Sequence, residues 1–223
     1  MPAGKPAEIS VPALGACLAG CGTSVPSGVL PALADYVGML MRWNRIMNLV
    51  GTRSWQDTVR TLVTDSFHLA DFILTLPLPA EPVTWDLGAG AGLPGIPLRL
   101  AWQAGSYTMV ELRQKRAMFL SQAVGTLRLP RTAVFAGDVA DFFGRQTASA
   151  DLVVSRAFMP WEALLALVAP HVRPGGLVVV MASAQLSGAV PGGWAAHGQH
   201  AYAVSAPRKG ARWLWALRRE GQA

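Results

Sequence analysis

The sequence VTWDLGAGAGLPGIPLRLA, residues 83–101, is the most informative part of the chain, because it predicts a strand, a glycine-rich turn and a helix in immediate succession. Glycines leave the turn without side-chain bulk, so the backbone can bend sharply and approach a ligand closely. The helix that follows directs free N–H groups toward the same place. A GxGxxG spacing alone is weak evidence for nucleotide binding. The glycines of this turn are Gly88, Gly90, Gly92 and Gly95.

Asp86, which ends the expected strand, separates two classes of ligand for this turn. Turns that bind dinucleotides usually follow an apolar residue, because a carboxylate beside the loop would repel a pyrophosphate. A carboxylate would instead attract a cationic ligand, such as the amino acid end and sulfonium of S-adenosylmethionine. The alternative is a tight strand-to-helix turn in which the Asp only caps the helix.

The composition indicates one α/β domain with an appendage, because 223 residues with 52% hydrophobic content can bury a full core. No uninterrupted run of about 18 apolar residues occurs, so we expect no membrane-spanning helix. Cys17 and Cys21 are the only cysteines, and we interpret them as ordinary thiols in a cytoplasmic protein, with no metal site. The net charge of +6 resides after residue 83, which suits a polyanionic substrate or simply a solvated basic face.

The periodicity of apolar residues divides the chain into three parts. Residues 1–29 predict a loose leader, and residues 30–80 predict a helical extension with helices over 30–47 and 54–76. In the remainder, 81–223, strands and helices alternate, which predicts a mostly parallel, doubly wound sheet with an antiparallel C-terminal edge. The expected strands are 83–87, 106–111, 132–137, 151–155, 175–182, 198–205 and 211–218, and the expected helices are 94–104, 113–127, 138–144 and 160–170.

The residues that end these strands are candidate ligand contacts, because such sheets bind ligands outside the carboxyl ends of their strands. Glu111 ends the second strand, where its carboxylate can accept both ribose hydroxyls or balance the dipole of the next helix. Asp138 follows the third strand, where it can accept from an adenine amino group or cap the next helix. The backbone of Val139 and Ala140 offers a further contact to adenine.

The motif Ser155-Arg156-Ala157-Phe158, at the end of the fourth strand, narrows the reaction. Methylation of exocyclic amino groups in nucleic acids requires a (D/N)PP(Y/F) loop, which is missing here. Methylation of pyrimidine C5 requires a thiolate, and no Cys follows residue 21. An Arg and an aromatic ring fit a nucleophile that needs no proton removal, such as guanine N7, with catalysis by in-line positioning.

Arg156 is therefore the candidate catalytic residue. Its planar guanidinium can hold the carboxylate of the cofactor, guanine O6 or a flanking phosphate. We expect a carboxylate, from the protein or from the cofactor, within salt-bridge reach, because an unpaired cation would oppose formation of a cationic product base. The alternative is that Arg156 pairs with Asp86 or Glu111 and only orders the strand ends.

Five groups of residues match one known family. They are Trp43-Asn44-Arg45 with Asn48-Leu49, Asp65-Ser66, DLGAGAGLPGIPL over 86–98, Lys115-Arg116 with Phe119-Leu120, and the SRAF motif over 155–158. Over roughly residues 30–218 the chain resembles the bacterial glucose-inhibited division protein B (GidB, or RsmG) family of 16S ribosomal RNA guanine-N7 methyltransferases.

The resemblance implies a Rossmann-like methyltransferase fold with S-adenosylmethionine as the methyl donor. It implies a guanosine in the decoding-region loop of 16S rRNA as the target, and the rRNA or the small-subunit ribosomal particle as the partner of a monomeric protein. The positions that match the cofactor contacts of the family are Gly88, Leu93, Val139, Ala140 and Arg156.

Three positions depart from the pattern of the family. Asp138 stands where Arg is frequent, Ala182-Ser183 replaces Lys-Gly, and Leu62 replaces His. These departures concern the RNA side, for which we expect a distributed basic patch. Its candidate residues are Arg45, Arg53, Arg208, Lys209 and Arg212.

Two alternatives stay open on the sequence alone. One is a methyltransferase that acts on another RNA site or on a small molecule. The other is a nicotinamide- or nucleotide-binding module without methyl transfer. Titration with cofactors separates the second alternative from the methyltransferases. RNA dependence of methyl transfer separates the first alternative from an rRNA guanine-N7 methyltransferase.

Overall fold

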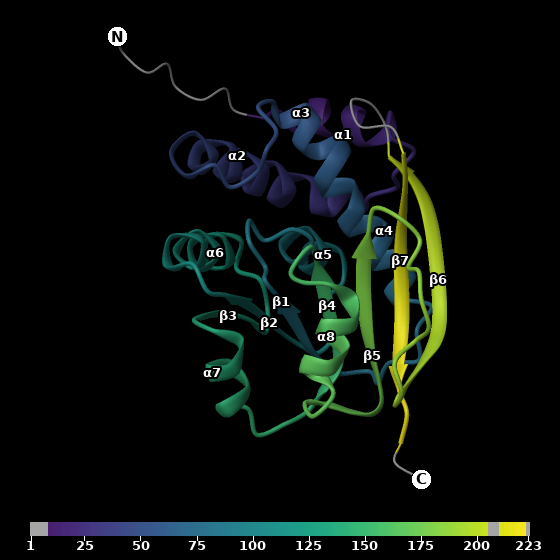
Figure 1. Ribbon diagram of the computed structural model, residues 1–223. Coiled ribbons are helices and arrows are strands. Elements are labelled where there is room, and N and C mark those ends of the chain that lie inside the picture. Colours follow the sequence, from purple (N-terminus) through teal and green to yellow (C-terminus); the bar gives the residue numbers. More distant parts are fainter. Residues whose placement is uncertain (1–8, 205–209, 222–223) are drawn as a thin grey trace.

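A seven-stranded mixed sheet forms the centre of the computed structural model, which describes residues 9–204 and 210–221 (Figure 1). The strand order is β3-β2-β1-β4-β5-β7-β6; β1 to β5 run parallel, and β7 and β6 form an antiparallel hairpin at the edge. The expected mostly parallel, doubly wound sheet with an antiparallel C-terminal edge is confirmed. The strands are β1 Val83–Leu87, β2 Ser106–Glu111, β3 Thr132–Ala136, β4 Ala150–Arg156, β5 Val172–Ala182, β6 Trp194–Val204 and β7 Gly210–Arg219.

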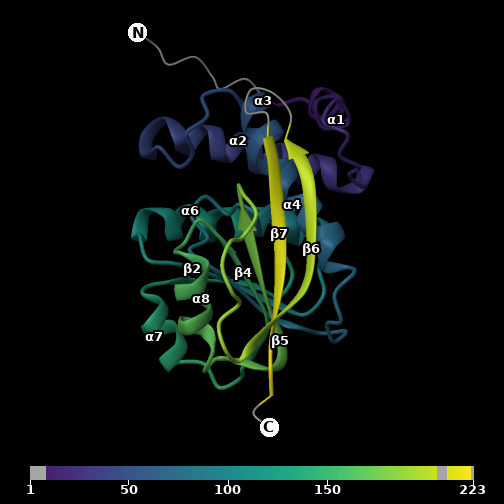
Figure 2. The same ribbon diagram turned by 45° about the vertical axis from the view of Figure 1, so that its right-hand side comes forward.

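Helices cover both faces of this sheet (Figure 2). One hydrophobic core joins one face to the N-terminal helices, α5 and α6, and a second core joins the other face to α7 and α8. No helix within 9–204 and 210–221 is long and apolar enough to cross a membrane. The helices are α1 Val11–Ala19, α2 Leu30–Met47, α3 Trp55–Thr58, α4 Thr64–Ile73, α5 Gly95–Ala101, α6 Gln114–Leu127, α7 Val139–Gly144 and α8 Trp161–Val168, with short turns η1 Ser27–Val29 and η2 Val59–Val63.

The N-terminal helices belong to the same core as the sheet. α2 buries Leu33, Val37 and Leu40, and the hydroxyl of Tyr36 donates to the carbonyl of Ala91 in the glycine-rich turn at 2.7 Å. Both ribbon views place α1 to α3 beyond the carboxyl ends of β4 and β5 (Figures 1 and 2). The extension therefore lies over the carboxyl ends of the strands, where a ligand is expected.

The expectation of a loose leader over residues 1–29 is wrong for the part of that segment which the structure describes. Helix α1 begins after Ser10, whose side chain accepts from the N–H of Ala13. Leu14 and Leu18 are buried, and α1 packs against α2. Small residues surround these two leucines in the sequence, so the buried face gives too short an apolar pattern to predict a helix.

The helix expected over 54–76 consists of three consecutive pieces, α3, η2 and α4. The side chain of Ser54 accepts from the N–H of Asp57 at 3.1 Å, so the expected N-terminal cap is confirmed. Between α3 and α4 the chain forms the π-helical turn η2. Turns of this kind interrupt the regular helical register and frequently occur at functional sites.

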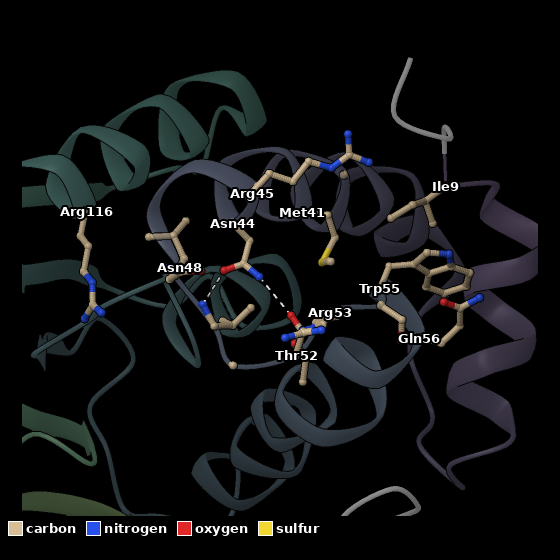
Figure 3. Close-up of a pocket in the computed structure, with 15 residues that line it drawn as sticks. Ile9, Met41, Asn44, Arg45, Asn48, Thr52, Arg53, Trp55, Gln56 and Arg116 are labelled. Carbon is tan, nitrogen blue, oxygen red and sulfur yellow. Dashed lines mark hydrogen bonds between the residues drawn. The ribbon is translucent and has the colours of Figure 1, made fainter. Parts of the chain in front are cut away.

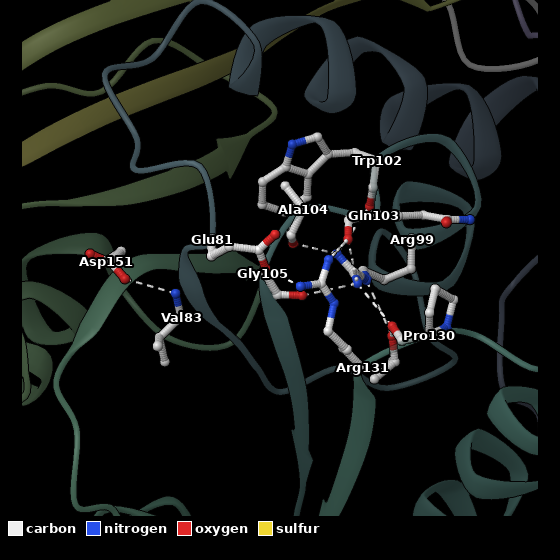
Figure 4. A network of polar contacts seen from close by, with 11 residues as sticks. Glu81, Val83, Arg99, Trp102, Gln103, Ala104, Gly105, Pro130, Arg131 and Asp151 are labelled. Atoms are coloured by element: carbon white, nitrogen blue, oxygen red, sulfur yellow. Dashed lines mark hydrogen bonds and ion pairs between the residues drawn. The ribbon is translucent and has the colours of Figure 1, made fainter.

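At the amino ends of the parallel strands, buried polar groups hold the strands together (Figure 4). Arg99 is fully buried, and its guanidinium donates to five carbonyls and to the hydroxyl of Thr132. Asp151 accepts from the N–H of Val83 and pairs with Arg173. The carbonyls that Arg99 contacts belong to Trp102, Gln103, Ala104, Gly105 and Pro130.

Candidate active site

The glycine-rich turn lies where the strand order reverses, between β1 and β4. Open α/β sheets bind their ligands at this position. Gly88, Gly90 and Gly92 have φ angles of +75°, +60° and +76°, a left-handed conformation that side chains with a Cβ rarely adopt. The sequence prediction of a tight glycine turn is confirmed, and the turn faces the ends of β2, β3 and β4.

A cavity of about 280 Å³ lies between these strand ends. Gly88, Glu111, Asp138, Val139 and Phe158 contribute to its wall, one or two from each strand end. A Cβ on Gly88 would lie 2.6 Å from Cδ2 of Phe158, so the ring can close the cavity only because this position is glycine. Acidic acceptors, backbone N–H groups and one aromatic ring on a single wall suit a nucleoside with a ribose and a flat base.

Glu111 connects the glycine-rich turn to α6. Its Oε2 accepts from the N–H of Gly90 at 2.9 Å, and its Oε1 accepts from the N–H of Arg113 at 2.8 Å. The side chain is only 5% exposed, but it lines the cavity. The bond to Arg113 supports the expected interaction with the helix N-terminus, and each oxygen keeps a second lone pair. Binding of ribose by Glu111 stays a prediction.

Asp138 caps α7, because its Oδ1 accepts from the N–H of Ala140 at 2.8 Å. This result confirms the capping alternative, while contact with an adenine amino group stays a prediction. The backbone N–H of Ala140 already donates to Asp138. Of the two backbone N–H groups predicted to contact adenine, that of Val139 is therefore the better donor.

Three other predicted cofactor residues are buried at the base of the turn. Asp86, Gly92 and Leu93 are buried, and a Cβ on Gly95 would lie 2.5 Å from Oδ2 of Asp86. The hydroxyl of Tyr107 donates to the same oxygen at 3.1 Å. Burial raises the pKa of Asp86 to about 7, with a smaller opposing contribution from the Tyr107 hydrogen bond. Asp86 therefore supports the turn from below, and any attraction to a cation acts through the turn.

Arg156 lines a second cavity, of about 470 Å³, at the ends of β4 and β5. Its Nη2 lies 2.9 Å from Oδ2 of Asp65, and its Nη1 donates to the carbonyl of Leu62 at 3.4 Å. The expected carboxylate within salt-bridge reach is confirmed. The alternative that this carboxylate is Asp86 or Glu111 is wrong, because Arg156 pairs with Asp65. The carboxylates of Asp86 and Glu111 accept instead from the Tyr107 hydroxyl and from backbone N–H groups.

The two cavities meet at Ala157, which lines both. Ala157 has a φ angle of +53°, an unusual conformation for a residue with a side chain. The turn directs Arg156 into the larger of these two cavities and Phe158 into the smaller one. Neighbouring residues of one short motif therefore serve two adjacent sites.

A third cavity, of about 880 Å³, lies between α2, the segment that follows it and α3 (Figure 3). The amide of Asn44 donates to the carbonyl of Thr52 and accepts from the N–H of Val50, which fixes the segment against the helix. Arg45 and Arg53 line this cavity together with Arg116, which also lines the 280 Å³ cavity. The large cavity is thus basic and adjoins the predicted cofactor site.

The predicted RNA-binding residues are divided between two places. Arg45 and Arg53 are exposed on the 880 Å³ cavity, and Arg212 lines the 470 Å³ cavity with Arg156. Arg208 and Lys209 lie outside the described residues. Of the positions that depart from the family pattern, Leu62 and Ala182-Ser183 also line the 470 Å³ cavity.

Comparison with known proteins places the chain in a family. The family model described as rRNA small subunit methyltransferase G, GidB, matches residues 30–190. The chain belongs to the GidB family. A protein of Nitratidesulfovibrio vulgaris named ribosomal RNA small subunit methyltransferase G is 56% identical over 191 residues, which cover 86% of each chain. One with the same name from Oleidesulfovibrio alaskensis is 42% identical over 96% of this chain and 95% of the relative.

Solved structures support the fold of the family. The Escherichia coli protein yhhF matches with a TM-score of 0.53 and 19% identity, over 70% of this chain and 84% of its own. An rRNA methylase of Streptococcus thermophilus matches with a TM-score of 0.50 and 12% identity, over 70% of this chain and 96% of its own. The Rossmann-like methyltransferase fold expected from the sequence is confirmed.

Three side chains in or beside these cavities were not among the predicted site residues: Asp65, Tyr202 and Arg116. Asp65 belongs to the Asp65-Ser66 motif that matches the family, and that match was a usable signal. Arg116 likewise belongs to such a motif. Tyr202 lies on β6, 137 residues from Asp65, and no local pattern connects the two.

Proposed function

We propose that this protein transfers a methyl group from S-adenosylmethionine to N7 of a guanosine in the decoding-region loop of 16S rRNA. The observation that carries the proposal is the arrangement of the strand ends at the switch point. There a glycine-lined cavity with two carboxylates on its wall adjoins a second cavity that contains a paired arginine. Relatives at 42% and 56% identity carry the name of a ribosomal RNA small subunit methyltransferase.

The residues of the 280 Å³ cavity fit S-adenosylmethionine. Glu111 would accept from the ribose hydroxyls, and the N–H of Val139 would contact the adenine beside Asp138. The turn at Gly88 and Gly90 would hold the amino acid part and the sulfonium of the cofactor. The negative field of Glu111 and Asp86 would stabilise their positive charges. When bound, the cofactor supplies an electrophilic methyl group.

The acceptor guanine is proposed to enter from the 470 Å³ cavity. Guanine N7 carries a lone pair and no proton, so the reaction needs no general base. Arg156 cannot act as a base at working pH, because the guanidinium keeps its proton. Its role is to hold guanine O6 or a flanking phosphate and to aim N7 at the methyl group, so that catalysis comes from positioning.

The basic residues of the large cavity are proposed to hold the RNA that flanks the target. Arg45, Arg53 and Arg116 project from two helices and one loop around a single hollow, a suitable arrangement for binding phosphates of an irregular RNA loop. Guanidinium groups bind phosphate in a bidentate manner, which also fixes orientation.

The test is methyl transfer from labelled S-adenosylmethionine to 16S rRNA and to small-subunit particles, followed by digestion and identification of the labelled nucleoside. The proposal expects N7-methylguanosine at one position, and Arg156→Ala should reduce its formation at least about a hundredfold. Label on another nucleoside would favour a different RNA target. No transfer to either RNA substrate, with S-adenosylhomocysteine still bound, would favour a small-molecule acceptor.

A further inference from the structure

A series of side-chain contacts that begins on β6, the outermost strand, holds Arg156 in place. Its guanidinium contacts Asp65 at the start of α4 and the carbonyl of Leu62 in the π-helical turn η2. The two contacts use different nitrogens, Nη2 and Nη1, so the planar group is fixed in orientation as well as in place. The remaining N–H groups of the same guanidinium are available to the cavity.

Asp65 is in turn fixed by a residue from the other end of the chain. It is 1% exposed, and while its Oδ2 contacts Arg156, its Oδ1 accepts from the hydroxyl of Tyr202 at 3.0 Å. Burial raises the pKa of Tyr202, so the phenol keeps its proton and acts as a donor. The Tyr202 ring stacks on His68 at 4.1 Å between centroids, which restrains the ring itself.

The charge of the Arg156 pair matters for the reaction proposed above. Methylation at N7 leaves the guanine with a positive charge, so an uncompensated guanidinium beside it would disfavour the transition state. The Asp65 carboxylate neutralises Arg156 and still leaves it as a hydrogen-bond donor. A buried carboxylate with both oxygens engaged can do this without approaching the base.

We propose that Asp65 and Tyr202 are positioning residues for methyl transfer. Both lie on the wall of the 470 Å³ cavity beside Arg156, and they act on the reaction by orienting and neutralising its guanidinium. The inference rests on the proposed function, because it assigns the two residues to that reaction. It also means that the β6–β7 hairpin contributes to the site, since Tyr202 lies on β6.

The experiment compares Asp65→Asn and Tyr202→Phe in the full-length protein. Asp65→Asn keeps the shape of the side chain and removes its charge; Tyr202→Phe removes only the hydroxyl. Asp151→Asn is the matched control, because Asp151 is also a buried aspartate that pairs with an arginine and accepts a second hydrogen bond, but near the amino end of β4, away from the carboxyl ends of the strands. Melting temperature, S-adenosylhomocysteine affinity, RNA affinity and single-turnover rate are measured for each.

The single-turnover rate should fall about tenfold to a hundredfold in Asp65→Asn and about tenfold in Tyr202→Phe, the loss expected for hydrogen bonds to charged groups. RNA affinity should be unchanged or higher in Asp65→Asn, since the variant gains net positive charge. When either substitution is combined with Arg156→Ala, the single-turnover rate should fall by no more than about twofold below that of Arg156→Ala alone. Residues that act through Arg156 have no further effect once it is removed. Asp151→Asn should lower only the melting temperature.

A full single-turnover rate in folded Asp65→Asn and Tyr202→Phe would overturn the inference. So would a parallel loss of RNA affinity and rate, or defects that multiply with that of Arg156→Ala. If the unaltered protein transfers no methyl group to rRNA, the proposed function fails and the inference fails with it, an outcome distinct from a variant-specific failure.

Discussion

Gly90 and Gly92 should respond differently to the same substitution, although they are two residues apart in one turn. Both have positive φ angles, +60° and +76°. A Cβ on Gly90 would have Gly88 O at 3.7 Å and Nη1 of Arg116 at 3.9 Å as its nearest neighbours, which are ordinary contacts. A Cβ on Gly92 would lie 2.4 Å from Cδ1 and 2.8 Å from Cγ1 of Ile96, a fully buried side chain.

The magnitudes follow from these contacts. An alanine in the left-handed region costs roughly 1–2 kcal/mol, and this cost is common to both variants. Overpacking against Ile96 adds roughly 1–3 kcal/mol for Gly92→Ala alone. For a protein of this size 1 kcal/mol lowers the melting temperature by roughly 2–4 °C. Gly92→Ala should therefore melt roughly 2–12 °C below Gly90→Ala.

Calorimetric unfolding of the two variants tests this difference directly, and titration with S-adenosylhomocysteine tests the role of the turn. Gly90→Ala should remain folded and bind the cofactor product about tenfold more weakly, a loss of roughly 1.4 kcal/mol, because its methyl group stands on the open side of the turn. Equal melting temperatures would refute the packing described for Gly92. Unchanged affinity in Gly90→Ala would remove this residue from the cofactor site.

Three further predictions concern buried polar groups. Glu111→Ala should weaken cofactor binding about tenfold to a hundredfold and also lower stability, since each backbone hydrogen bond to the carboxylate contributes roughly 1.5–3 kcal/mol; isothermal titration and denaturant unfolding measure the two effects. The raised pKa of Asp86, about 7, means that the folded protein binds this proton more tightly than the unfolded chain. The free energy of unfolding should therefore fall as pH rises from about 4 to 7, by up to about 1.4 kcal/mol per unit, and Asp86→Asn should flatten that slope in denaturant titrations. Arg99→Lys should lower the free energy of unfolding by more than about 3 kcal/mol because several buried carbonyls lose their donor, and cofactor affinity of the folded variant should be unchanged.

Local sequence patterns were sufficient to predict the sheet and the glycine-rich turn, because strand alternation and glycine spacing report on neighbours in the chain. Helix α1 was not predictable in this way, since its stability depends on burial of Leu14 and Leu18 against α2. For the carboxylate beside Arg156, the sequence pattern at the strand ends pointed by residue number only to Asp86 and Glu111. That carboxylate is instead on α4, since Asp65 is brought to β4 only by packing of the N-terminal helices on the sheet.

The conformation of Ala157 explains why one short motif can serve both substrates of a transfer reaction. An extended residue at this position would send the side chains on either side of it to the same face of the strand, because side chains alternate. The left-handed turn at φ +53° instead places Arg156 in one cavity and Phe158 in the other, with Ala157 on the wall of both. Methyl transfer requires that donor and acceptor lie in line at close range, so a residue shared by two adjacent cavities marks the place where the methyl group would cross. A larger residue than Ala157 would stand on the shared wall of the two cavities, which the proposed reaction has to join.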